Sequence, residues 1–374
     1  MFRRALLALT ILVGLSAGAP AATTEAANPD IAFLRGVVGA VYTMTNDPVD
    51  NRIVIFHRLA NGQLLPGGSI STGGQGTGQG IGNQASLALS PDHRWLVAVN
   101  AGSSDISVFA VRRHGLILVE REPAGGLTPI SVAVASRHVY VLNEGGEGGI
   151  SGFDLSPFGQ LNPIPGSIQP LSGPGVDPAQ IAFSLFGRVL IVTEKNTDQI
   201  LTYVVDRDGA AGPPTVHESA GPTPFGFELG KRGHLFVSEA AGGADLASST
   251  SSYRVRFDGS LERISEAVLA EGSAACWLVV TRDGRYAFTS NTANHTISTY
   301  EIGFDGEITL QGVTNTGEGT RPLDSALTPN SRFFYVLNSG DGTLGAYSVG
   351  SQGELEPLDL DIDGLDGANG LVAR

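Results

Sequence analysis

Seven short apolar segments of the chain each end in a polar side chain that can bind or activate a ligand. Five of these side chains are asparagines and two are glutamates, in the order Asn46, Asn100, Asn143, Glu194, Glu239, Asn291 and Asn338. A carboxylate held beside a substrate can take a proton from water, and an amide can orient hydroxyl groups. The two glutamates break the asparagine pattern, so we assign them as candidate catalytic residues.

Further candidates surround these polar ends. Lys195 follows Glu194 directly, and Arg321 closes the stretch GEGTR (317–321). Either cation can polarise a carbonyl group and stabilise the oxyanion that develops on it. Together with the five asparagines, the residues expected to contact the substrate are Gln84, Phe225, Trp277, His295 and Asp324.

Other roles stay open for the same residues. Asparagine is a common turn former, so the asparagines can equally cap loops. Surface solvation is the alternative role for Glu194, Glu239 and the charged residues beside them. We expect no cofactor, with a divalent cation held by the two glutamates and the asparagine oxygens as the alternative.

The polar ends recur with a regular spacing, between 43 residues (Asn100 to Asn143) and 54 residues (Asn46 to Asn100). An alternating strand follows each of them and leads to a Gly-bearing hairpin turn, as in HGLI (114–117) or DGEI (305–308). Six of the seven units also begin with an extra strand and turn, such as LALSPDHR (87–94). Four antiparallel strands repeated seven times predict an all-β fold, the seven-bladed β-propeller.

The first unit lacks its opening strand, and the chain ends on NGLVAR (369–374). A propeller must close its ring so that no sheet edge stays open. We therefore predict that this C-terminal strand becomes the innermost strand of the first blade. Ring closure would then gather the seven polar ends and the loops between blades at the mouth of the central channel, where concave polar sites belong.

The N-terminus has the pattern of a targeting segment. Arg3 and Arg4 precede the apolar run ALLALTILVGL (5–15), and Ala19-Pro20-Ala21 offers a small-residue cleavage site. We assign residues 1–27 to a signal peptide with a short leader and residues 28–374 to a single propeller domain. The protein is then exported to the periplasm or the extracellular space, with an uncleaved membrane anchor as the alternative.

The charge of the chain excludes several classes of partner. The formal net charge is −14, which repels nucleic acid and anionic lipid. Cys276 is the single cysteine, so no internal disulfide can form. We expect a monomer that binds a small molecule and makes no membrane contact after the signal peptide is removed.

Several stretches resemble a known family, among them TGGQGTG (72–78), VNAGSSDISVF (99–109) and CWLVVTRDGRYAFTSN (276–291). With the seven-unit spacing, they resemble the seven-bladed β-propeller lactonase family of 6-phosphogluconolactonase-type and carboxymuconate lactonising enzymes. Within it, the chain is similar to the exported subgroup called 3-carboxymuconate cyclase-like. The resemblance implies that Glu239, in VSEA (237–240), matches the family's strand-end acid.

Two family motifs are changed in this chain. The family's G-P-R-H stretch corresponds to Gly221-Pro222-Thr223-Pro224, and its P-H-x-H stretch corresponds to Pro178-Ala179-Gln180. Two hypotheses follow. The first is an exported lactonase-like enzyme that acts on a small lactone or sugar acid at the central channel. The alternative is a non-catalytic propeller that binds a protein or an envelope glycan through its polar rim.

Overall fold

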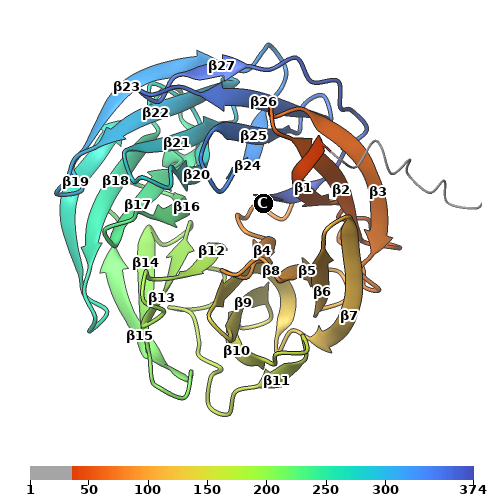
Figure 1. The fold of residues 1–374 in the computed structure, drawn as a ribbon. Helices are drawn as coiled ribbons and strands as arrows, with labels where there is room; N and C mark the ends of the chain where they lie inside the picture. Colours follow the sequence, from red (N-terminus) through yellow and green to blue (C-terminus); the bar gives the residue numbers. More distant parts are fainter. Residues whose placement is uncertain (1–35) are drawn as a thin grey trace, which may run out of the picture. The chain divides into compact units, whose positions relative to one another are not determined.

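The computed structural model describes residues 36–374, which form a ring of seven four-stranded antiparallel sheets (Figure 1). The predicted seven-bladed, all-β propeller is confirmed. The helical content of the described residues is small, and η2 (Ala241–Gly243) is one 3₁₀ turn. Residues 36–374 include no helix that is long and apolar enough to cross a membrane. The predicted signal peptide lies outside the described residues.

The blades follow one another along the chain, and only the first draws on both ends. From the innermost strand outward, blade 1 consists of β28 (Asn369–Ala373), β1 (Val37–Met44), β2 (Arg52–Leu59) and β3 (Leu64–Ser71), and blade 2 of β4 (Leu87–Leu89), β5 (Trp95–Asn100), β6 (Asp105–Arg112) and β7 (Gly115–Pro123). Blade 3 consists of β8 (Leu127–Ala135), β9 (His138–Gly145), β10 (Gly149–Leu155) and β11 (Leu161–Pro163), and blade 4 of β12 (Pro178–Phe183), β13 (Val189–Glu194), β14 (Gln199–Val205) and β15 (Ala211–Glu218).

Blades 5 to 7 have the same order. Blade 5 consists of β16 (Pro224–Leu229), β17 (His234–Glu239), β18 (Ser249–Val255) and β19 (Leu261–Leu269), and blade 6 of β20 (Ala275–Val280), β21 (Tyr286–Asn291), β22 (Thr296–Ile302) and β23 (Ile308–Asn315). Blade 7 consists of β24 (Pro322–Leu327), β25 (Phe333–Asn338), β26 (Thr343–Val349) and β27 (Leu355–Pro357).

The C-terminal strand closes the ring as predicted. β28 pairs antiparallel with β1, with Leu371 opposite Thr43 and Val372 opposite Tyr42. The pairing continues to the last residue, because Arg374 N–H donates to the Ala40 carbonyl at 2.8 Å. Leu371 is buried in the same apolar cluster as Val41. The chain end therefore supplies both the ladder and part of the core between blades 7 and 1.

The core lies between neighbouring blades, because both faces of the inner strands are covered. The second strands β5, β13, β17, β21 and β25 are buried at every position. Aromatic side chains bridge adjacent blades, as in the pair Phe288 and Phe334, whose ring centroids are 5.4 Å apart. Each blade thus needs both neighbours to bury its apolar side chains.

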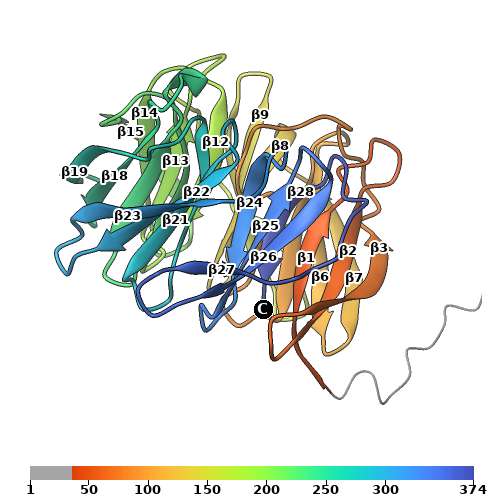
Figure 2. The same cartoon turned by 90° about the horizontal axis from the view of Figure 1, so that it is seen from above.

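The ring has two distinct faces, which Figure 2 shows from the side. We call one the loop face: the inner strands begin there, the second strands end there, and the loops between blades cross it. The other is the turn face, which carries the turns between the first and second strands of each blade. The chain also ends on the turn face, at Arg374.

Candidate functional site

The seven predicted polar strand ends form a ring near the loop face, but their side chains are buried. None is more than 5 % exposed, and Asn100, Glu194, Glu239 and Asn291 are fully buried. The asparagines mainly donate to hydroxyls of the following strand. Asn291 Nδ2, for example, donates to Ser298 Oγ at 2.7 Å. A side chain added at Gly272 would overlap the Asn291 amide, so the incoming loop packs directly on it.

The same capping pattern holds elsewhere in the ring. Asn100 Nδ2 donates to Ser107 Oγ, Asn143 Nδ2 to Ser151 Oγ and Asn338 Nδ2 to Thr343 Oγ1, at 2.8 to 3.1 Å. Asn46 instead donates to the Gln79 carbonyl in the glycine-rich loop, at 2.6 Å. These contacts tie strand ends to the following strand, or for Asn46 to the loop after blade 1, which is the capping role left open by the sequence.

The two glutamates take the same position in blades 4 and 5. Glu239 accepts hydrogen bonds from Gly221 N–H at 2.8 Å and from the hydroxyls of Ser249 and Ser219. Burial raises the pKa of Glu239, although these hydrogen bonds oppose the shift. Glu194 accepts Ser172 N–H at 3.0 Å and the Thr197 hydroxyl at 2.9 Å. Both carboxylates therefore hold loops in this structure, and their catalytic role stays a prediction.

Lys195, Phe225 and Trp277 do come together, as part of a plug that closes the channel at the loop face. Lys195 Nζ forms a 2.9 Å ion pair with Asp177 and lies 4.9 Å above the Phe225 ring. The rings of Phe225 and Trp277 have centroids 5.1 Å apart, and both side chains are buried. Lys195 also donates to the Gly82 carbonyl at 2.6 Å, which fixes the glycine-rich loop over the channel.

The end of that loop completes the plug. Asn83 is fully buried, and its carbonyl accepts the Trp277 indole N–H at 2.8 Å. Gln84 crosses to blade 6, where its amide exchanges two hydrogen bonds with the backbone of Leu278, at 2.8 and 3.0 Å. Loop residues 82–84 thus fill the loop-face end of the channel.

Arg321 and His295 lie beside each other on the loop face, apart from the plug. Arg321 is exposed, and its N–H donates to His295 Nδ1 at 3.1 Å. No ion pair of Arg321 forms with a carboxylate of the described chain. The two residues thus contact each other through a backbone N–H and an imidazole, and their roles toward a substrate stay predictions.

The channel beneath this plug forms a cavity with a volume of about 650 Å³. Its deep end is formed by Gln84 and Asp324, which are 8 % and 3 % exposed. Its wide end is formed by the exposed turn residues Pro91, Arg282 and Pro329. The channel therefore opens on the turn face, whereas the sequence led us to expect a site at the loop face.

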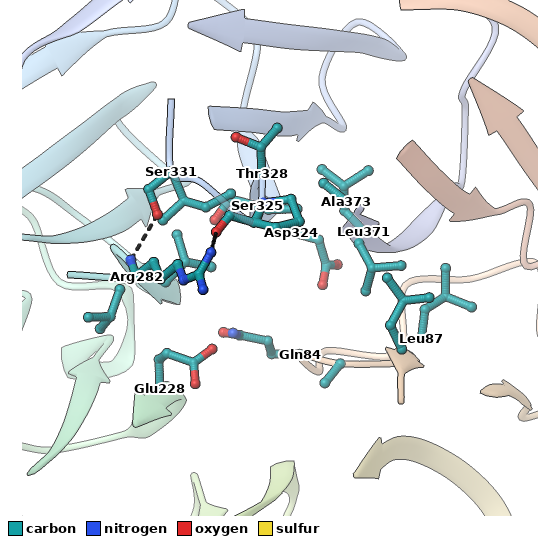
Figure 3. A pocket seen from close by; sticks show the side chains of 18 of the residues that line it. Gln84, Leu87, Glu228, Arg282, Asp324, Ser325, Thr328, Ser331, Leu371 and Ala373 are labelled. Atoms are coloured by element: carbon teal, nitrogen blue, oxygen red, sulfur yellow. Dashed lines mark hydrogen bonds between the residues drawn. The ribbon is translucent and has the colours of Figure 1, made fainter. Parts of the chain in front are cut away.

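Two carboxyl groups point into this cavity from opposite sides of Gln84, as Figure 3 shows. Glu228, on β16, is partly exposed to the cavity, and one carboxylate oxygen accepts Leu229 N–H at 2.8 Å. Asp324, on β24, accepts Gly370 N–H at 3.1 Å. Burial raises the pKa of Glu228 to about 7 and that of Asp324 to about 7. Of the residues predicted to contact the substrate, Gln84 and Asp324 both line this cavity.

Other polar groups lie along the same cavity. The Ser325 hydroxyl has no hydrogen-bond partner among the described residues. Arg282 stands at the wide end, where its N–H donates to Ser331 Oγ and its guanidinium to the Pro329 carbonyl (Figure 3). Gln180 is not free to turn, because its amide exchanges two hydrogen bonds with Phe227 on β16.

The turns around the wide end are basic. Each inner hairpin turn carries an exposed arginine, and these are Arg94, Arg137, Arg188, Arg232, Arg285 and Arg332. The inner strand of blade 1 has no such turn and ends at Arg374. On a chain with a net charge of −14, this collar places positive charge on the turn face, where the channel opens, and Arg282 is the arginine that lines the cavity itself.

Glu228, Ser325 and Arg282 are site residues that the sequence did not reveal. A carboxylate within the apolar run FGFEL (225–229) is the one signal that was present, because an acid in an innermost strand must face either the channel or the core. Within residues 36–374, no three His, Cys, Asp or Glu side chains gather as they would around a metal ion. The divalent cation that the sequence left open as an alternative was assigned to two glutamates and asparagine oxygens, a set of ligands that this observation does not address.

Solved structures with the same fold include candidate 6-phosphogluconolactonases from Bacteroides fragilis (19% identity, TM-score 0.71) and Bacteroides uniformis (21% identity, TM-score 0.70). Each match covers 90% of this chain and 98% or 99% of the other. A periplasmic gluconolactonase from Pseudomonas aeruginosa matches with 15% identity and a TM-score of 0.70, covering 90% of this chain and 98% of its own. No curated protein matches the sequence significantly.

The sequence itself carries a family signature. The description "Lactonase, 7-bladed beta-propeller" matches residues 41–144 and 244–367, which together are more than half of the chain. The matched segments include blades 2 and 6 in full, and the structure has the seven blades that the description requires. This chain belongs to the seven-bladed β-propeller lactonase family.

Proposed function

We propose that this protein hydrolyses a small lactone in the central channel, which the substrate enters from the turn face. The observation that carries the proposal is the pair of carboxyl groups, Glu228 and Asp324, inside a cavity of about 650 Å³. Both have a pKa raised to about 7, so each exchanges protons readily near neutral pH. Membership of the lactonase family supports the same reaction class.

Hydrolysis needs one group to accept a proton and one to donate a proton. In the proposed reaction Glu228, the more exposed carboxylate, takes a proton from the water that attacks the lactone carbonyl carbon. The ring C–O bond then breaks, and Asp324 in its acid form protonates the departing alkoxide. The product is the open hydroxy acid, and proton transfer through solvent restores the two carboxyl groups.

The remaining groups would position the substrate. The arginine collar favours substrates that carry a carboxylate or phosphate, because it attracts anions to the mouth. The predicted residues Glu194, Glu239, Lys195 and Arg321 remain an alternative set on the loop-face side, for which the plug would have to move.

Export is part of the proposal, on the strength of the signal-peptide pattern in residues 1–27. The gluconolactonase from Pseudomonas aeruginosa named above is periplasmic, which is consistent with this assignment. Sequencing the N-terminus of the protein recovered from a periplasmic fraction tests it. A start between residues 20 and 28 is expected, and recovery from the cytoplasm with residues 1–27 intact would refute export.

The activity is tested with a panel of γ- and δ-lactones of sugar acids, with and without a phosphate group. Ring opening is followed by acid release, for the wild type and for Glu228→Gln. We expect at least one substrate whose turnover falls about 100-fold in the variant, as is usual when a general base is removed. A panel on which the wild type never exceeds the buffer rate would contradict the proposal and favour the non-catalytic alternative.

The non-catalytic alternative, binding of a protein or glycan through the polar rim, has less support. The ring of asparagines and glutamates that would form the rim is buried in hydrogen bonds within the blades. Because these amide and carboxylate groups are buried, an outside partner does not reach them.

A further inference from the structure

The strongly exposed aromatic side chains of residues 36–374 all lie on the turn face. Phe158, Phe186, Phe257 and Phe304 are 79%, 69%, 66% and 81% exposed, and each sits in a turn of blades 3 to 6. The other Phe, Tyr and Trp side chains described are buried or half-buried. Exposed aromatic residues grouped on one face mark an interaction surface.

Two of these rings form the wall of a small pocket between blades 4 and 5. Phe186 and Phe257 have ring centroids 5.8 Å apart, and Leu185 and Val255 extend the apolar lining. The pocket has a volume of about 260 Å³, enough for one large side chain. Its size and apolar lining would fit one aromatic side chain of a partner protein.

The rim of this pocket is positively charged. Arg232, Arg254 and Arg256 line it, and Glu262 is the one carboxylate among residues 36–374 that pairs with them. Glu262 lies 2.6 Å from Arg256 and 3.9 Å from Arg254, so it balances only part of the charge. Arg232 stacks 4.4 Å above the Phe304 ring and forms no ion pair within the described chain. A fitting partner would combine an apolar side chain with a neighbouring carboxylate.

The chain itself presents such a group beside the pocket. Phe304, the most exposed of the four rings, is followed by the exposed Asp305 at the tip of the outer turn of blade 6. Arg232 links this tip to the pocket, because it lines the pocket and also stacks on Phe304. The pocket and its complement thus lie side by side on one face, so a twofold axis could bring each of them against the other in a second copy.

We propose that two copies of this protein associate through their turn faces about a twofold axis. Phe304 of each copy enters the pocket formed by Phe186 and Phe257 of the other, and Asp305 meets Arg254 there. The contact is reciprocal and closed, so it yields dimers rather than filaments. This departs from the monomer expected from the sequence. The dimer would use the face on which the channel opens, but its test does not depend on the proposed activity.

Sedimentation equilibrium of the purified protein over a concentration series tests the proposal. We expect a reversible monomer–dimer equilibrium that Phe304→Ser and Phe257→Ser each weaken by about 10-fold or more, as loss of an aromatic anchor does. Phe158→Ser is the matched control, since Phe158 is equally exposed on the same face but lies on blade 3, away from the pocket. The control should dimerise like the wild type.

Exchanging the charges of Asp305 and Arg254 tests the proposed contact between them directly. Asp305→Arg and Arg254→Glu should each weaken the dimer, and the double variant should recover most of the lost affinity because the pair is restored with its signs reversed. Circular dichroism checks that each variant is folded. Recovery in the double variant is not expected if the substitutions only disturb the fold.

Three outcomes would overturn the proposal. One is a wild type that stays monomeric up to about 100 µM, beyond the range of weak specific dimers. Another is a dimer that Phe304→Ser leaves unchanged or that Phe158→Ser weakens equally. The third is a monomer that co-sediments with phosphatidylethanolamine–phosphatidylglycerol vesicles and loses that binding with Phe304→Ser, which would assign the surface to a membrane.

Discussion

Gln84 and Leu278, 194 residues apart in the chain, are joined by two hydrogen bonds across the axis of the propeller. Gln84 Nε2 donates to the Leu278 carbonyl at 2.8 Å, and Leu278 N–H donates to Gln84 Oε1 at 3.0 Å. The side-chain amide of Gln84 therefore pairs with the backbone of β20 in the way that a residue of a neighbouring strand would. This clip holds the plug in place and makes the channel a cavity closed at the loop face.

Gly226 is expected to be essential for that clip. A side chain there would collide with Gln84 Oε1 and with the Cys276 carbonyl. Gly226→Ala should displace Gln84 and cost about 1–3 kcal/mol of unfolding free energy, as overpacking of a tight interior does. Gly312→Ala is the control, since no atom lies within 4 Å of its added Cβ. Equal melting temperatures for the two variants would show that the plug tolerates movement.

Removal of the C-terminal strand should destabilise the ring. Deleting residues 369–374 removes the β28–β1 ladder and the buried Leu371 and opens two sheet edges. We expect a loss of about 3–5 kcal/mol from the side chains alone, and aggregation or a much lower melting temperature. Leu371→Asp should be nearly as harmful. An unchanged melting temperature of the truncated protein would contradict the closure scheme.

Arg374→Ala should be milder than either change. Its guanidinium donates to the Tyr42 hydroxyl at 2.9 Å and to the Arg112 carbonyl at 2.7 Å, but its backbone pairing with Ala40 does not depend on the side chain. We expect a cost of about 1 kcal/mol for these partly exposed hydrogen bonds. Thermal unfolding beside Leu371→Asp measures the difference.

Glu228→Gln and Glu239→Gln should separate catalysis from stability. Glu239 accepts hydrogen bonds from Gly221, Ser249 and Ser219, so an amide there should cost about 1–3 kcal/mol of stability and spare the turnover of the folded fraction. Glu228→Gln should remove turnover and keep the fold. If Glu239 is the base, as predicted from its strand-end position, kcat falls in Glu239→Gln instead.

The rate should rise with pH through neutrality if Glu228 is the base. Its pKa is raised to about 7, so the carboxylate that accepts the proton forms mainly above that value. Asp324 must stay protonated to donate, and its pKa is also about 7, so the rate should fall again at higher pH. A pH profile of kcat/KM that is flat between pH 5 and 9 would exclude this pair.

The folded protein should become less stable as pH rises towards neutrality, whereas a protein with a salt-bridged acid becomes more stable as that acid ionises. Both carboxyls have a folded-state pKa of about 7, above the unfolded value of about 4. Between these values the folded state binds more protons, so unfolding free energy should fall as pH rises from about 4 to about 7. Asp324→Asn should flatten this slope and raise the melting temperature relative to wild type at pH 8. An identical slope in the variant would show that Asp324 does not contribute.

The fold could be predicted almost completely from the sequence, because its signals are local. The turn glycines, the strand alternation and the spacing of the polar ends each act within one blade, and seven equal units leave a ring as the closed arrangement. Because the first unit lacks its opening strand and the chain ends on the extra strand NGLVAR (369–374), the sequence also predicted how the ring closes. Gln84 and Asp324 were also predicted as channel contacts, because ring closure brings the beginnings of the inner strands together.

Only the tertiary structure decided which polar groups meet the channel and which face is open. Asn291 and Glu239 have the residue types of a binding site, yet Asn291 donates to Ser298 on the following strand and Glu239 accepts from Gly221 in the loop between blades 4 and 5. In the sequence Glu228 is one acid within an apolar strand, and only the closed ring of seven blades shows that it lines a channel that opens on the turn face. Burial and pKa depend on what surrounds a group in three dimensions, so residue type and spacing alone could not determine them.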